Sequence, residues 1–71
     1  MNSNLFNQFT DNGFVYDTNE NIWTKDNENS YFTASIDTDG SIIAVMTNDD
    51  ADYDEIVADT FNEFIEWVNN K

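Results

Sequence analysis

The chain has no cysteine, proline or histidine, and only two glycines and two basic residues in its 71 positions. Without cysteine, no disulfide supports the core, and the usual mark of an oxidising compartment is missing. No apolar run approaches the roughly 18 residues that span a bilayer, and no signal-peptide pattern opens the chain. These absences predict an intracellular protein of the cytoplasm, which would be the host cytoplasm for a phage-encoded chain.

The same absences argue against catalysis. Histidine and cysteine supply the commonest general base, the thiolate nucleophile and the usual zinc ligands, so all three are lost. The two glycines, Gly13 and Gly40, form no phosphate-binding loop. Paired carboxylates alone can hydrolyse glycosides, but a chain of this length can hardly enclose the deep cleft that the reaction needs. We expect neither an enzyme nor a cofactor.

What the chain does carry is acid. The chain has fifteen Asp and Glu residues but only two basic residues, Lys25 and Lys71, which gives a formal charge of −13. A small domain needs a net charge of only about 2–8 in magnitude for solubility, and self-repulsion at higher charge works against the compact state. The excess predicts a strongly basic partner. It would also repel nucleic acid and anionic membranes, so we expect neither as a direct ligand.

The composition also predicts a folded core. Apolar residues make up 39% of the chain and aromatic residues 15%, whereas disordered acidic tails are poor in aromatics. No repeat, linker or Pro/Gly-rich stretch divides the sequence, so we expect a single acidic domain over residues 1–71. A domain of this size buries only about 60% of its unfolded surface, which predicts modest stability.

Short helix and strand patterns fill the first part of the chain. Residues 3–11 predict a helix with Ser3 as N-cap and Asn12-Gly13 as the C-terminal stop. Residues 14–17 and 22–25 are short apolar runs separated by a polar turn, which fits either a hairpin or one bent edge strand. The apolar face of the predicted helix comprises Leu5, Phe6 and Phe9.

A clearer hairpin joins residues 31–37 and 41–47 around Asp39-Gly40, a pair suited to a two-residue type I′ turn. Counting back from that turn pairs Asp37 with Ile42, Ile36 with Ile43, and Ala34 with Val45. A buried sheet face must combine alternate residues from both strands. The face predicted in this way consists of Phe32, Ala34, Ile36, Ile43 and Val45.

The C-terminal segment, roughly residues 52–69, has the strongest helical pattern. Asp52 and Glu55 resemble a capping box, and an apolar stripe follows at 100° per residue. The predicted fold is a small α+β domain of order α-β-β-β-α. In it, a long amphipathic C-terminal helix covers a three-stranded antiparallel sheet, with residues 14–17 as an optional fourth strand. The stripe comprises Tyr53, Ile56, Val57, Phe61, Phe64, Trp67 and Val68.

The polar side of the same predicted helix carries a row of carboxylates at steps of three and four residues. Like charges at this spacing cost a helix roughly 0.2–0.5 kcal/mol per pair, and no basic residue relieves them before Lys71. A regular row of anions resembles the phosphates of a nucleic-acid strand. The alternative is an ordinary solvated helix face. The row consists of Glu55, Asp59, Glu63 and Glu66.

A second acidic cluster lies in the preceding loop and the first predicted turn: Asp49, Asp50, Asp52, Asp54 and Glu55. One or two acids complement the positive end of a helix dipole, and five exceed that need. The surplus would extend the anionic surface onto the loop. The sequence does not place the acids of two further loops, Asp26 and Glu28 in one and Asp37 and Asp39 in the other.

No metal site is predicted beyond weak adventitious binding of divalent cations, because neither Asp-rich loop matches an EF-hand. In a loop starting at Asp50, Glu55 replaces the required glycine; in one starting at Ser35, the final position is Met46. Among the aromatic residues, Tyr31 points opposite its neighbour Phe32 and is predicted to be an exposed anchor for a partner. The core is the predicted place of Tyr53 and Trp67.

The sequence therefore predicts an acidic mimic of nucleic acid that occupies the basic groove of a DNA- or RNA-binding protein, such as a nuclease, and excludes the true ligand. In general appearance the chain resembles phage-encoded inhibitors of host defence, such as anti-restriction and anti-CRISPR proteins, without a motif of a particular family. The alternatives are a regulatory or adaptor domain whose acidity is incidental, and adaptation to a salty cytoplasm. A monomer is favoured, because two acidic faces repel each other.

Overall fold

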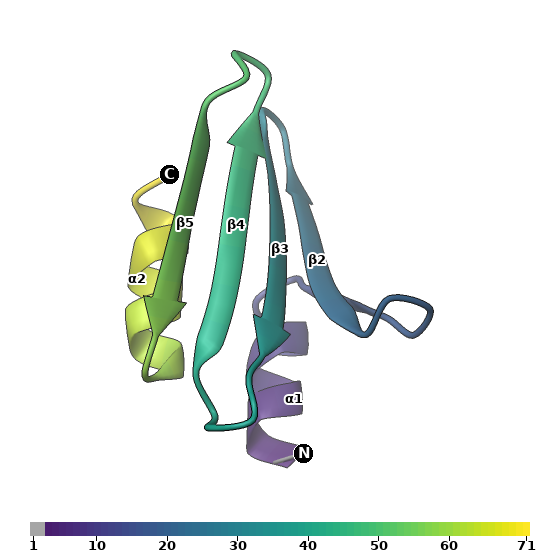
Figure 1. The fold of residues 1–71 in the computed structure, drawn as a ribbon. Helices are drawn as coiled ribbons and strands as arrows, with labels where there is room; N and C mark the ends of the chain where they lie inside the picture. Colours follow the sequence, from purple (N-terminus) through teal and green to yellow (C-terminus); the bar gives the residue numbers. More distant parts are fainter. Residues whose placement is uncertain (1–2) are drawn as a thin grey trace.

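The computed structural model describes residues 3–71. Within them the strands make one antiparallel sheet in which each strand pairs with its neighbour in the chain. Both helices lie against one face of this sheet and leave the other face open (Figure 1). The elements are α1 (Ser3–Asp11), β1 (Val15–Asp17), β2 (Ile22–Asn27), β3 (Ser30–Ile36), β4 (Ile42–Asn48), β5 (Tyr53–Ala58) and α2 (Phe61–Asn69).

The predicted fold, a three-stranded sheet under a long C-terminal helix, is wrong. The sheet has five strands, residues 53–58 form the last of them, and α2 is only nine residues long. In β5, Ile56 and Ala58 point toward the core and Val57 points away, so the period is two rather than 3.6. The strand pairs along its whole length with β4, and this pairing outweighs the local helical pattern.

Helix α2 begins at Phe61, after Thr60 as its N-cap. The Thr60 hydroxyl accepts a hydrogen bond from the backbone N–H of Glu63 (3.2 Å), and the two residues have the Thr-x-x-Glu spacing of a capping box. The predicted capping pair, Asp52 and Glu55, caps no helix, because Asp52 precedes β5 in a turn and Glu55 lies on β5. The chain contains both patterns, and the fold uses the one with threonine.

The hairpin of β3 and β4 is present, but the predicted register is wrong by one residue. Ile36 pairs with Ile42, and Ala34 pairs with Ala44. Because side chains alternate along a strand, a shift of one residue exchanges the buried and the exposed side chains of β4. The buried residues of β4 are Ile42, Ala44 and Met46, whereas Ile43 and Val45 face the open side of the sheet.

The cause of the shift is a three-residue loop in place of the expected two-residue turn. Asp37 N–H donates to the Ser41 carbonyl (2.9 Å), and Gly40 N–H donates to the Asp37 carbonyl (3.0 Å). Gly40 has a φ of 91°. This arrangement is that of a type I turn followed by a left-handed residue in a G1 bulge, which suits Asp-Gly as well as a type I′ turn does.

The N-terminal half agrees more closely with the sequence patterns. Helix α1 over Ser3–Asp11 is confirmed, although capping by the Ser3 side chain lies outside the described part of the chain. The helix ends at Asp11, and Gly13 follows it with a φ of 87°, while Phe14 N–H donates back to the Phe9 carbonyl (3.0 Å). The next two runs form the β1–β2 hairpin rather than one bent strand.

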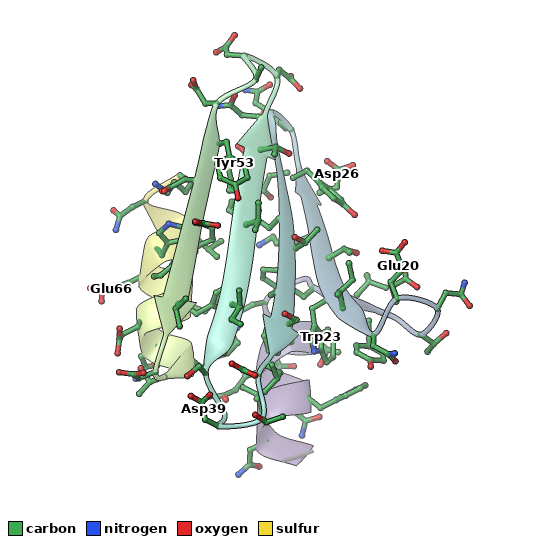
Figure 2. All side chains as sticks on the ribbon, viewed as in Figure 1. Glu20, Trp23, Asp26, Asp39, Tyr53 and Glu66 are labelled. Carbon is green, nitrogen blue, oxygen red and sulfur yellow. The ribbon has the colours of Figure 1, made fainter. Side chains whose placement is uncertain are left out.

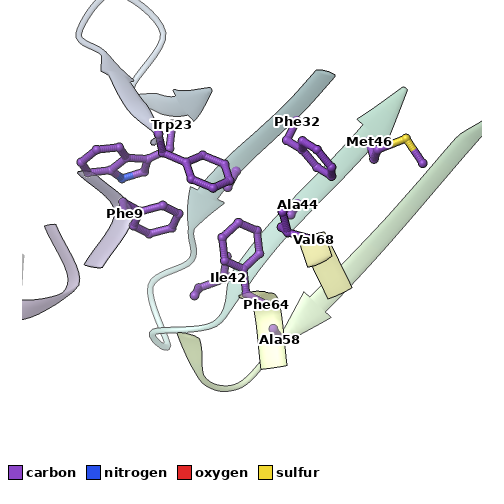
Figure 3. Close-up of a cluster of buried hydrophobic side chains, with 11 residues drawn as sticks. Phe9, Trp23, Phe32, Ile42, Ala44, Met46, Ala58, Phe64 and Val68 are labelled. Atoms are coloured by element: carbon purple, nitrogen blue, oxygen red, sulfur yellow. The ribbon is translucent and has the colours of Figure 1, made fainter. Parts of the chain in front are cut away.

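The core fills the space between the helices and the sheet (Figure 3). Phe9 of α1 stacks on Trp23 of β2, with ring centroids 4.7 Å apart, and meets Phe64 of α2 at 5.4 Å. Farther along the sheet, Phe32 contacts Trp67 at 5.8 Å. Among residues 4–71, whose side chains the structure describes, no polar or charged side chain is buried. Every acidic side chain therefore lies at the surface of the protein, and the core itself is uncharged and largely aromatic.

Neither helix of the described chain has the length and apolar character needed to cross a membrane.

Candidate functional site

The predicted row of carboxylates does not exist as one helical stripe. Glu55 lies on β5, Asp59 lies in the link between β5 and α2, and Glu63 and Glu66 lie on α2. The four residues are exposed, but strand β5 has taken the place of the first half of the expected helix. The regular repeat that a single helix would have given is therefore lost.

Five acids do come together at one end of the sheet. The β2–β3 turn and the β4–β5 turn lie side by side there (Figure 1), and Asp49 N–H donates to the Asn29 carbonyl (3.0 Å). We name this group the acidic tip, and all of its side chains are exposed. It joins three predicted site residues to two of the four loop acids that the sequence could not place. Its members are Asp26, Glu28, Asp49, Asp50 and Asp52.

The β4–β5 turn within the tip is held by its own hydrogen bonds. The side-chain oxygen of Asn48 accepts the N–H groups of Asp50 (3.0 Å) and Asp52 (2.9 Å), as in an Asx turn. Ala51 adopts a left-handed conformation with a φ of 64°. The polar run 48–52 between two strands is a turn signal that the expectation of a helix obscured. No three acidic side chains of the described chain are grouped so that they could hold a metal ion.

Further acids lie at the opposite end of the sheet, on the β3–β4 loop (Figure 2 labels Asp39). Asp59 and Gly40 line one shallow hollow at this end. The backbone N–H of Ser41 donates to the Asp39 carboxylate (2.9 Å) and is the main reason that the pKa of Asp39 is lowered. Because the molecule extends 34 Å along its longest axis, the loop acids form two separate groups rather than one surface.

The two lysines leave both groups of loop acids unpaired. Lys71 makes an ion pair with Asp54, which also accepts a hydrogen bond from the indole N–H of Trp67 (3.1 Å). The Lys71 ammonium, and then the Trp67 indole, lower the pKa of Asp54. The ammonium of Lys25 instead donates to the Asn12 carbonyl (2.9 Å). The Lys71–Asp54 contact is the one ion pair within residues 3–71, and Asp54 is thus the predicted site residue least available to a partner.

The face of the sheet away from the helices is less acidic than the two ends. Along β3 and β4 it carries Tyr31, Thr33, Ser35, Ile43, Val45 and Thr47, and along β5 it carries Tyr53, Glu55 and Val57. We name this surface the open face. Its centre consists mainly of hydroxyl-bearing and apolar side chains. Carboxylates stand toward its margins, so the open face combines apolar contact area with an acidic rim.

The tyrosines were predicted with mixed success. Tyr31 is 44% exposed on the open face, so its predicted exposure is confirmed, while its role in binding stays a prediction. Tyr53 was expected in the core and is 63% exposed on the open face, so that expectation is wrong. Its hydroxyl donates to the Glu55 carboxylate (2.9 Å), and this hydrogen bond raises the pKa of Tyr53. Trp67 packs against the core, as expected.

Comparison with protein-family models, with curated proteins and with solved structures finds no match for this chain.

Proposed function

We propose that this protein is an acidic inhibitor that occupies the basic groove of a nucleic-acid-binding protein and keeps DNA or RNA out of it. The observation that carries the proposal is the display of carboxylates. The chain has fifteen acidic residues and two lysines, and one ion pair is present within residues 3–71. An anionic body of this kind attracts a cationic groove at long range and speeds their encounter.

The density of charge is comparable with that of a duplex. The molecule is 34 Å long, which is about one turn of B-DNA. A duplex of that length carries about 20 phosphates, at one charge per ~1.7 Å of axis. The protein has a formal charge of −13, or about two-thirds of that value over the same length. The resemblance proposed is one of overall charge and size, since the helical repeat of carboxylates is not present.

Enzymes that act on foreign nucleic acid are suitable targets. Effector complexes of the CRISPR type hold their guide–target duplex in a positively charged channel and recognise it through its backbone. A rigid polyanion competes for that kind of surface without reading sequence. Anti-restriction or anti-CRISPR inhibition in the cytoplasm, where such enzymes meet their substrates, is therefore the proposed setting.

A competition assay tests the proposal. A fluorescently labelled duplex is bound to a restriction endonuclease, to a guide-loaded Cas9-type effector and to a basic RNA-binding protein, each at about 50 mM salt, where charge interactions are strong. The protein is then titrated in while fluorescence anisotropy is followed. Displacement of the labelled duplex from at least one of these proteins supports the proposal. Failure to displace it from any member of the panel would overturn it.

Matched variants separate the acidic tip from net charge. Asp49→Asn with Asp50→Asn removes two charges at the tip, and Asp11→Asn with Glu20→Gln removes two exposed charges elsewhere. None of these four side chains accepts a hydrogen bond from the rest of the described chain, so both variants should fold. We expect the tip variant to compete more weakly than the control. Equal weakening would assign the effect to the field of the whole molecule.

A second candidate function is a small regulatory or adaptor domain that binds another protein through the open face. The exposure of Tyr31, Tyr53 and Val57 on that face favours it. Contacts made by such side chains should persist as salt is raised, whereas binding by a polyanion should weaken. Raising the salt in the same assay therefore distinguishes the two functions.

A further inference from the structure

One row of the open face combines two tyrosines with carboxylates, next to the acidic tip. Asp26 is directly opposite Tyr31, Tyr31 is opposite Thr47, and Thr47 is opposite Tyr53, so the row crosses β2, β3, β4 and β5. Asp26, Tyr31 and Thr47 also line a shallow hollow together with Asp49 of the tip. Figure 2 shows the two ends of the row, Asp26 and Tyr53, near the end of the sheet that bears the tip.

Each tyrosine of this row has a carboxylate beside it. Tyr31 is the cross-strand partner of Asp26. Tyr53 lies two residues before Glu55 on the same side of β5, and its hydroxyl donates to the Glu55 carboxylate (2.9 Å). The two rings stand on strands that are two apart, which separates them by about 9.5 Å at the usual strand spacing. The short Thr47 side chain lies between them.

The pairing of an exposed ring with a carboxylate is a suitable receptor for arginine. A guanidinium is planar, stacks on aromatic faces, and binds a carboxylate through two parallel hydrogen bonds. A lysine ammonium can also lie over a ring, as Lys71 does over Trp67, but it cannot stack flat on the ring or bind a carboxylate through two parallel hydrogen bonds. The charge of the molecule, −13, already calls for a cationic partner, and the row adds apolar contact that charge alone lacks.

We propose that this row docks arginine side chains of a basic protein partner, one guanidinium against Tyr31 and Asp26 and another against Tyr53 and Glu55. The inference rests on the proposed function and specifies its contact chemistry. The rest of the acidic surface attracts the partner from a distance. The row then selects arginine over lysine and fixes the orientation in which the partner binds.

The test uses an arginine homopeptide and a lysine homopeptide of equal length as probes. Each is titrated into the isotope-labelled protein at low salt, and backbone amide signals are followed by nuclear magnetic resonance. We expect the arginine peptide to bind more tightly and to shift the signals of Tyr31, Thr47, Tyr53 and Glu55. The variant Tyr31→Leu with Tyr53→Leu keeps apolar cover but removes both rings, and should bind the arginine peptide about 5–25-fold more weakly.

Val15 lies on the open face as well, because it pairs with Thr24 and Thr24 pairs with Thr33. A control variant replaces exposed apolar residues of this face outside the row, Val15→Ala with Val57→Ala, and should leave both affinities unchanged. Equal affinities for the two peptides, with no loss in the double tyrosine variant, would overturn the arginine row and leave the proposed function standing as binding by charge. If neither peptide binds, both proposals fail. Preferential binding of a single-stranded oligonucleotide across the two rings would also overturn the arginine row, because stacked bases use the same kind of surface.

Discussion

Two neighbouring isoleucines give the sharpest test of the sheet register. Ile42 is 1% exposed in the core, and Ile43 is 38% exposed on the open face. Threonine is β-branched like isoleucine, so Ile→Thr changes burial chemistry more than strand propensity. At position 42 it removes a buried methyl group, about 0.8 kcal/mol, and buries a hydroxyl without a partner, about 1–3 kcal/mol. We expect Ile42→Thr to lower the free energy of unfolding by about 3 kcal/mol.

Ile43→Thr should be much milder. Since part of Ile43 is already in water, the lost methyl group is worth at most about 0.5 kcal/mol there, and the new hydroxyl stays hydrated. Unfolding by urea, followed by the fluorescence of the buried Trp23, measures both variants. We expect the two variants to have the same m value, and the midpoint of urea unfolding to be clearly lower for Ile42→Thr than for Ile43→Thr. An equal or larger loss for Ile43→Thr would contradict the register and restore the two-residue turn.

Because the domain is small, a second pair of substitutions that destabilises it less is also needed. At 0.05–0.15 kcal/mol per residue, the whole chain is stable by about 3.5–10 kcal/mol, so Ile42→Thr could leave too little folded protein to measure. Ile42→Val should cost about 0.5–1.5 kcal/mol and Ile43→Val clearly less. The order of the two losses, and not their size, decides between the registers.

Three further predictions concern charge and turn geometry. The lowered pKa of Asp54 means that its stabilisation is fully present above its unfolded value near 3.8 and is lost as pH falls through the folded value; urea unfolding at pH 6 and pH 3 should therefore show Asp54→Asn more destabilising at pH 6 than at pH 3. A destabilisation that is the same at both values would refute the ion pair with Lys71. Gly40→Ala should cost about 1–2 kcal/mol, because Gly40 has a φ of 91° and a Cβ would meet no other atom, which leaves backbone strain as the sole cause; a neutral substitution in a thermal melt would contradict the bulged loop. Sodium chloride should raise the thermal midpoint, because it screens repulsion among the acids, and a midpoint that falls with salt would argue against net self-repulsion.

Local signals were enough to predict some elements. Helix α1 ends just before Asn12-Gly13 because Gly13 takes the left-handed conformation, and this stop can be inferred from Asn12-Gly13 alone. Tyr31 could be placed on the exposed side because it alternates with Phe32 along one strand. In each case, neighbouring residues in the chain carry the information.

The errors arose where two local patterns compete and distant contacts decide. Tyr53, Ile56 and Val57 fit a helical stripe, but pairing of β5 with β4 makes them a strand. Asp39-Gly40 fits turns of two lengths, and the choice between them sets which face of β4 is buried. Only the set of side chains that must fill the core, Ile42 among them, settles that choice.

The candidate site shows the same division. Charge alone made Asp49, Asp50 and Asp52 candidates for partner binding, because acidic residues can be counted without knowing the fold. Their association with Asp26 and Glu28 depends on two turns meeting at one end of the sheet, which follows from strand order. The row of Tyr31 and Tyr53 depends further on register across β3, β4 and β5, and no sequence pattern contains it.

The salt dependence of competition tests the central proposal most directly. The partner in this measurement is a basic nucleic-acid-binding protein from which the acidic protein displaces a duplex. The affinity of the acidic protein for this partner and the affinity of the duplex for the same partner would both be measured from about 50 to 200 mM salt. We predict that both affinities fall steeply on a double-logarithmic plot, because both polyanions use the same cationic surface. An affinity of the protein that stays level while that of the duplex falls would contradict the account.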